Sequence, residues 1–98
     1  MNNPCANLAA LQSNLQKEIN KIQTQIALDE AGLANDDPGF PTWDMAGVIG
    51  RIAQLQPGSL ADRYGALLLL LCQLAGYQTG GAAITATQKF GGCLNSVS

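Results

Sequence analysis

Six aliphatic residues recur at helical spacing through the first third of the chain, and this regularity constrains the fold more than any other feature. They are Leu8, Leu11, Leu15, Ile19, Ile22 and Ile26. The steps between them are 3, 4, 4, 3 and 4 residues, which average the 3.6-residue period of an undistorted α-helix. Because polar residues fill the steps, a long amphipathic helix is predicted within residues 1–33. Its narrow apolar stripe must pack either on other helices of this chain or on the same helix of sister subunits.

A turn-rich segment follows this helix. Residues 34–42 contain two prolines and one glycine, which are residue types that interrupt helices. Four carboxylates lie within nine residues, at Asp29, Glu30, Asp36 and Asp37. Their spacing is not that of an EF-hand calcium loop. We therefore interpret them as a solvent-exposed acidic corner without a metal.

The middle of the chain is predicted to form a helical hairpin. Thr42 can cap its first helix, which we expect from about Trp43 to Gln56, with Trp43 as a hydrophobic lid. The apolar side of this helix would consist of Met45, Val48, Ile49, Ile52 and Leu55. Gly47 and Gly50 lie among small residues on its other side, and each helical glycine costs about 1 kcal/mol relative to alanine. We therefore expect another backbone to approach that side closely.

Five consecutive leucines, residues 67–71, lie in the second helix of this hairpin, which we expect to end near Gly76. The apolar segment 66–76 spans only about 17 Å as a helix, against about 30 Å for the hydrocarbon core of a bilayer. The charge-free interval between Arg63 and Lys89 does contain 25 residues, but glutamines and glycines interrupt it. We therefore do not expect a membrane span. A helix that is apolar on every side is normally buried, and a three-helix bundle leaves one side open, so contact with another chain is expected.

The predicted interface between chains combines the stripe of the first helix with the leucine run. Its residues are Leu8, Leu11, Leu15, Ile19, Ile22, Ile26, Leu67, Leu68, Leu69 and Leu71. The composition favours the same interpretation, because only 12% of the residues are charged, about half of the usual share. A surface with so few charges is expected to be partly covered by neighbouring subunits.

The last segment, residues 79–98, is predicted to be an extended C-terminal arm. Its β-branched residues lie between two Gly-Gly pairs and allow a short strand over residues 82–90, and a helix over the same residues stays open. We interpret Cys5, Cys72 and Cys93 as reduced thiols of a cytosolic protein. A disulfide between Cys5 and Cys93 is the alternative.

Residue types that catalysis and ligand binding require are sparse. The chain has no histidine, no CxxC motif and no phosphate-binding glycine loop, so we expect no enzyme, no metal, no cofactor and no small-molecule substrate. Its five basic residues are scattered and its net charge is −2, so we expect no nucleic-acid partner. The opening residues MNNPCANLAAL lack a basic segment and an unbroken apolar stretch, so we expect no signal peptide.

The sequence therefore predicts one all-α domain, a small helical bundle. Its segments are the long amphipathic helix (1–33), the acidic Pro/Gly turn (34–42), the helical hairpin (43–78) and the extended arm (79–98). The expected function is that of a non-enzymatic structural subunit, packed by helix–helix contacts against copies of itself and other subunits of a symmetric assembly. A virion or phage particle is the assembly we expect, with the chain as an adaptor, cement or tail protein located in the virion or the cytoplasm. Two alternatives stay open: a small membrane-active protein, holin-like or active in ejection, and a soluble helical regulatory module.

Overall fold

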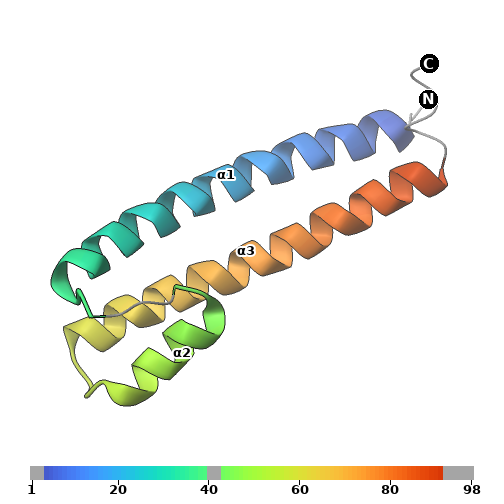
Figure 1. The fold of residues 1–98 in the computed structure, drawn as a ribbon. Coiled ribbons are helices and arrows are strands. Elements are labelled where there is room, and N and C mark those ends of the chain that lie inside the picture. Colours follow the sequence, from blue (N-terminus) through green and yellow to red (C-terminus); the bar gives the residue numbers. More distant parts are fainter. Residues whose placement is uncertain (1–3, 40–42, 92–98) are drawn as a thin grey trace.

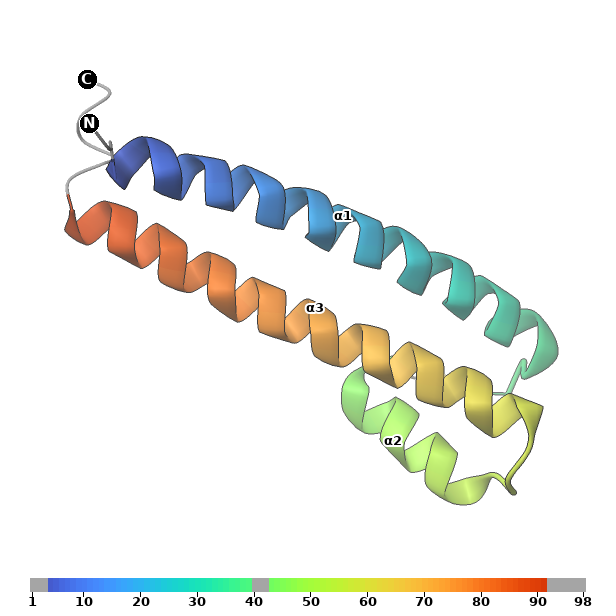
Figure 2. The same ribbon diagram turned by 180° about the vertical axis from the view of Figure 1, so that it is seen from behind.

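The protein is a long helical hairpin with one short helix beside it. The computed structural model describes residues 4–39 and 43–91, and these ranges contain three helices and no strand. The helices are α1 (Pro4–Asp36), α2 (Met45–Gln54) and α3 (Ser59–Phe90). Figures 1 and 2 show α1 and α3 side by side and antiparallel over their whole length, with α2 next to the first part of α3. The all-α class is confirmed, and the molecule is a rod of 56 × 21 × 19 Å.

The third helix is longer than the sequence predicted. We expected it to end near Gly76, but α3 continues without a break to Phe90, so residues 79–90 are helical. This corrects the boundary at residues 78 and 79 and resolves the alternatives for residues 82–90 in favour of the helix. The expected arm begins no earlier than Gly91, and residues 92–98 lie outside the described residues.

Packing against α1 explains why weak helix formers continue α3. Helices in proteins are stabilised mainly by tertiary contacts, and α1 is long enough to provide them along the whole of α3. Gln12 of α1 donates a hydrogen bond to Thr85 at 2.9 Å, which joins the two helices near the chain ends. The hydroxyl groups of Thr79 and Thr87 donate hydrogen bonds to carbonyl groups one turn earlier, at 2.9 and 2.8 Å. Both hydroxyl groups therefore have a hydrogen-bond partner within the helix.

The core lies where all three helices meet, and it uses part of the predicted interface. Its buried residues are Ile22, Ile26 and Leu33 from α1, Val48 from α2, and Tyr64 and Leu67 from α3. Ile19 is buried as well. The interface prediction is therefore wrong for Ile19, Ile22, Ile26 and Leu67 in the closed hairpin, because the chain covers these side chains itself.

The rest of the predicted interface is partly or largely exposed. Leu8, Leu15 and Leu71 are half-buried, and Leu68 also packs partly against the core. Leu11 is 55% exposed and Leu69 is 61% exposed. Within the leucine run, Leu69 is therefore the residue most available to another chain.

The short helix α2 differs from its prediction in its cap and in its contacts. Thr42 lies outside the described residues, and the cap is Asp44, whose carboxylate accepts a hydrogen bond from the Gly47 amide at 2.7 Å. Ile49, expected on the apolar side, is 51% exposed. A Cβ atom at Gly50 would meet nothing within 4 Å, so no backbone within the described residues makes the close approach that we expected there.

Alanine substitutions at Leu67 and Leu28 test which of the two leucines belongs to the core. Leu67 is fully buried, and its substitution Leu67→Ala should lower the free energy of unfolding by about 2–5 kcal/mol through lost burial and the cavity left behind. Leu28 is 62% exposed on α1, and Leu28→Ala should change it by no more than about 0.5 kcal/mol. Chemical denaturation followed by circular dichroism measures both values. Equal losses from the two variants would contradict this core.

Candidate functional site

Asp37 is the point at which the three helices are joined. Its carboxylate accepts hydrogen bonds from Arg51 Nε at 2.9 Å and Arg51 Nη2 at 2.8 Å. It also accepts one from the Tyr64 hydroxyl at 2.7 Å. Asp37 directly follows α1, Arg51 belongs to α2 and Tyr64 belongs to α3. We call these three residues the Asp37 cluster.

Local structure positions each member of the Asp37 cluster. The amide of Asp37 donates to the Leu33 carbonyl group at 2.6 Å, which continues the last turn of α1 and directs the chain toward α2. Trp43 stacks on the Tyr64 ring with centroids 6.1 Å apart, so the predicted hydrophobic lid covers an aromatic residue of the core. Because Arg51 is a bidentate donor, the orientation of its guanidinium group is fixed relative to the carboxylate.

The electrostatics of the Asp37 cluster make it a structural link rather than a proton-transfer group. Hydrogen bonds from Arg51 and Tyr64 lower the pKa of Asp37 below its ordinary value. Burial, followed by the hydrogen bond to Asp37, raises the pKa of Tyr64 to about 12. Near neutral pH the carboxylate therefore stays ionised and the phenol stays protonated. Neither group has the pKa near neutrality that efficient acid–base catalysis needs.

These contacts correct the prediction of a solvent-exposed acidic corner. Asp37 is buried, with only 9% of its surface exposed. Asp36 forms an ion pair with Arg63 of α3 at 2.5 Å, and Asp29 accepts a hydrogen bond from Gln25 at 2.9 Å. Within the described residues, no group of three acidic or cysteine side chains is placed to hold a metal ion.

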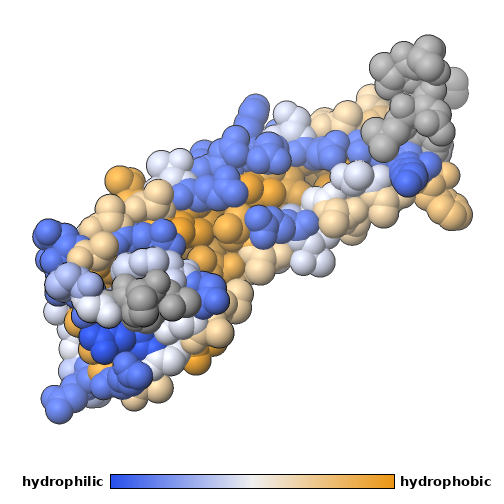
Figure 3. All heavy atoms as spheres, viewed as in Figure 1, coloured by the Kyte–Doolittle hydropathy of each residue, from blue (hydrophilic) through white to orange (hydrophobic). Residues whose placement is uncertain are grey.

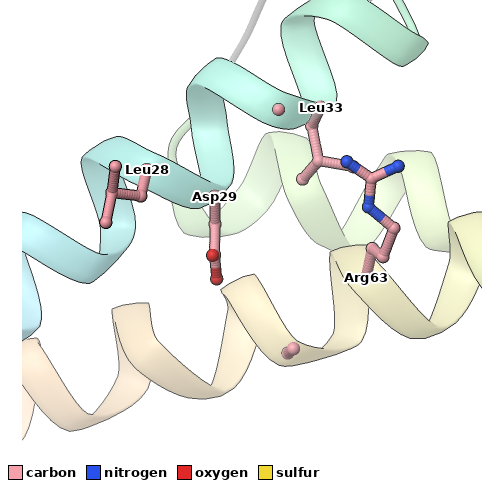
Figure 4. A pocket seen from close by; sticks show the side chains of 6 residues that line it. Leu28, Asp29, Leu33 and Arg63 are labelled. Carbon is pink, nitrogen blue, oxygen red and sulfur yellow. The ribbon is translucent and has the colours of Figure 1, made fainter.

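A shallow groove lies between α1 and α3 beside the Asp36–Arg63 ion pair. Its volume is about 210 Å³, and it is lined by Leu28, Asp29, Gly32, Leu33, Arg63 and Ala66. Figure 4 shows Arg63 extending from α3 toward α1, with Asp29 pointing down toward α3. A Cβ atom at Gly32 would lie 3.1 Å from Arg63 Nη2, so glycine leaves room for the guanidinium group. The groove accommodates the Arg63 side chain of this ion pair.

The side of α3 that faces away from α1 is the second notable surface. We call it the outer face of α3, and it consists of Gly65, Leu69, Cys72, Gly76, Gly80, Ala83 and Thr87, which are spaced by three or four residues. Apart from half-buried Gly80, all of these residues are exposed. None carries a charge, and Cys72 is a free thiol. In Figure 3 hydrophilic side chains gather along α1, whereas the surface over the second half of α3 is largely pale to orange.

By length and composition alone, α3 could also cross a membrane. Among the described residues it is the helix that meets this criterion, and only 6% of its apolar stretch is buried inside the protein. A core helix of a soluble protein would be mostly buried. The described residues of this chain therefore leave the outer face of α3 uncovered.

The cysteines differ in what the structure describes of them. The exposed Cys72 Sγ lies 4.0 Å from the Met45 sulfur, where α2 borders the outer face of α3. Cys5 is disulfide-bonded, so the prediction of a reduced thiol is wrong for this residue. Cys93, its partner in the alternative prediction, lies outside the described residues.

Comparison with known proteins gives this chain no relative. No family model, no curated protein and no solved structure matches it.

The pKa of Tyr64 gives the Asp37 cluster a measurable signature. The folded protein holds the phenolic proton more tightly than an unfolded chain, in which the pKa is 10.0. The stability from Tyr64 is therefore fully present below pH 10 and lost as the pH rises through about 12. Tyr64→Phe should remove this alkaline decline. It should also lower the free energy of unfolding at pH 7 by about 1.5–3 kcal/mol, the contribution of a hydrogen bond to a charged group.

Tyr77→Phe is the matched control, because it removes the hydroxyl of a tyrosine that is 38% exposed on the same helix. Denaturant unfolding from pH 7 to pH 12 measures both variants and the natural chain. An alkaline decline that survives Tyr64→Phe and disappears with Tyr77→Phe would refute the assignment.

Proposed function

We propose that this protein is a non-enzymatic structural subunit that associates with copies of itself through the outer face of α3. The observation that carries the proposal is the exposure of this uncharged face along a helix of 32 residues. Contiguous uncharged surface that includes an exposed leucine is typical of protein–protein contacts. A virion or phage particle, with the chain as an adaptor, cement or tail component, is the assembly that we propose for it.

The distribution of polar residues supports this orientation. The side of α1 that faces solvent carries Lys17, Glu18 and Lys21, and Glu18 pairs with Lys21 at 3.4 Å. Between Arg63 and Lys89, in contrast, α3 carries no charge over 25 residues. Association through α3 would leave the charged side of α1 in water. Its charged side chains would therefore incur no desolvation cost.

Leu69→Asp tests the proposal directly. A carboxylate at a buried apolar contact is costly, so this variant should weaken association at least tenfold while its helical circular dichroism signal is retained. Leu68→Asp is a poorer probe, because Leu68 packs against the core and its loss would destabilise the hairpin itself. Native mass spectrometry and light scattering at micromolar concentration measure the assembled fraction.

Leu28→Asp is the matched control, because Leu28 is 62% exposed and Leu69 is 61% exposed, yet Leu28 lies on α1. It should leave the assembly intact. A natural chain that is monomeric at micromolar concentration, or a Leu69→Asp variant that assembles normally, would overturn the proposal.

A membrane-active protein is the second candidate, and the length of α3 favours it. The 25 uncharged residues span about 37 Å as a helix, which exceeds the hydrocarbon thickness of about 30 Å. To insert, α3 would have to leave α1. Flotation with vesicles of neutral phospholipid tests this candidate, with a carbonate wash to remove peripheral protein. Wash-resistant flotation that Gly76→Asp abolishes would support insertion, and protein left at the bottom of the gradient would exclude it.

A further inference from the structure

We propose that two copies of the chain pair antiparallel along the outer face of α3, with a two-fold axis at Gly76. This inference rests on the proposed self-association and adds its geometry and register. The occupant of the uncovered face is then the same face of a second copy. Three independent features of the chain lead to this arrangement: the spacing of the face, its glycines and the distribution of charge.

The residues of the outer face are placed symmetrically about Gly76. They lie 4, 7 and 11 residues before it and 4, 7 and 11 residues after it. In an antiparallel pair centred on this residue, each position therefore meets its counterpart at the same level. Leu69 faces Ala83 of the other copy, Cys72 faces Gly80, and Gly65 faces Thr87. A larger side chain meets a smaller one at each of these three levels, which is the alternation that packed helices need.

No contact within the described part of the chain requires the glycines of this face. A Cβ atom at Gly65, Gly76 or Gly80 would meet nothing within 4 Å, so no neighbour in the described residues requires glycine there. Glycine is nevertheless the least favourable residue after proline inside a helix. Close approach of a second helix at these positions accounts for their presence, because a missing side chain lets two backbones come together.

The charges of the rod favour an antiparallel pair over a parallel one. The end of the hairpin next to α2 carries six carboxylates and two arginines, a formal charge of −4. The remainder, from the middle of α1 to the chain ends, carries one carboxylate and three lysines, a formal charge of +2. These two values account for the net charge of −2. An antiparallel pair places each acidic end at the same level along the rod as the lysine-bearing half of the other copy, with Lys17 and Lys21 on the solvent-facing side of α1, whereas a parallel pair places the acidic ends at the same level.

The free thiol of Cys72 makes the register measurable. In the antiparallel pair, the two Cys72 residues are eight residues apart along the helix direction, or about 12 Å. A disulfide requires Cα atoms within about 7 Å, so Cys72 should not link to Cys72. Gly80→Cys places a second thiol opposite Cys72 of the other copy, at a position where the new Cβ atom is unobstructed. Mild oxidation of Gly80→Cys should therefore give at least tenfold more covalent dimer than oxidation of the natural chain.

The double variant Cys72→Ser with Gly80→Cys is the matched control, because two cysteines at position 80 are again about 12 Å apart and should not link. Tryptic cleavage after Arg63 and Lys89 gives one peptide that contains positions 72 and 80, separate from Cys5 and Cys93. Mass spectrometry of this peptide thus excludes links through the other cysteines.

The outcomes separate the register from the proposed function. Efficient linkage through Cys72 in the natural chain, with the native mass still that of an assembly, would overturn the antiparallel register and leave self-association standing. An assembled Gly80→Cys variant without linkage would also overturn the register. A natural chain that is monomeric in the same buffer would overturn both.

Discussion

The carboxylate of Asp37 is the interaction on which the arrangement of this protein depends. It receives hydrogen bonds from a residue of α2 and a residue of α3, and it directly follows α1. This link fixes α2 on one side of the hairpin, where Val48 completes the core. Because α1 and α2 then cover two sides of the first part of α3, the link also determines which side of α3 stays uncovered. A small structural ion pair thereby sets which surface of α3 stays exposed.

The sequence predicted the number and order of the helices, and the reasons are local. The 3.6-residue period from Leu8 to Ile26 is a property of one segment, and it correctly indicated α1. The length of α3 was missed, because the glycines and threonines after residue 78 are weak helix formers and the stabilising partner is distant in sequence. The Asp37 cluster was missed for a related reason. Its members are 14 and 27 residues apart, and nothing in the acidic segment itself identifies the carboxylate that is buried.

An apolar pattern shows that a surface must be buried, and it does not identify the chain that buries it. The pattern of the stripe containing Ile19, Ile22 and Ile26 did not show which chain would bury it. In the structure, α3 of the same chain covers these residues. A soluble regulatory module that binds through the first helix would therefore have only the first half of the stripe available in the closed hairpin. For the leucine run the pattern was ambiguous in another way. Five adjacent leucines point in every direction around the helix, so one of them is in the core and another is largely exposed.

The energy of opening the hairpin separates the two candidate functions. Insertion of α3 into a bilayer would expose Ile19, Ile22 and Ile26 of α1 to water, at about 1.5–3 kcal/mol for each side chain. It would also break the hydrogen bond between Tyr64 and Asp37, so that a carboxylate loses a partner. Pairing of two closed hairpins incurs neither cost, since α1 keeps its contacts while α3 gains new ones. A bilayer can compensate only by burying the whole circumference of α3, including Gln73 and Gln78, whose side-chain amides are exposed in the closed hairpin and would need hydrogen-bond partners in a bilayer. These costs support our proposal of association between closed hairpins over insertion of α3.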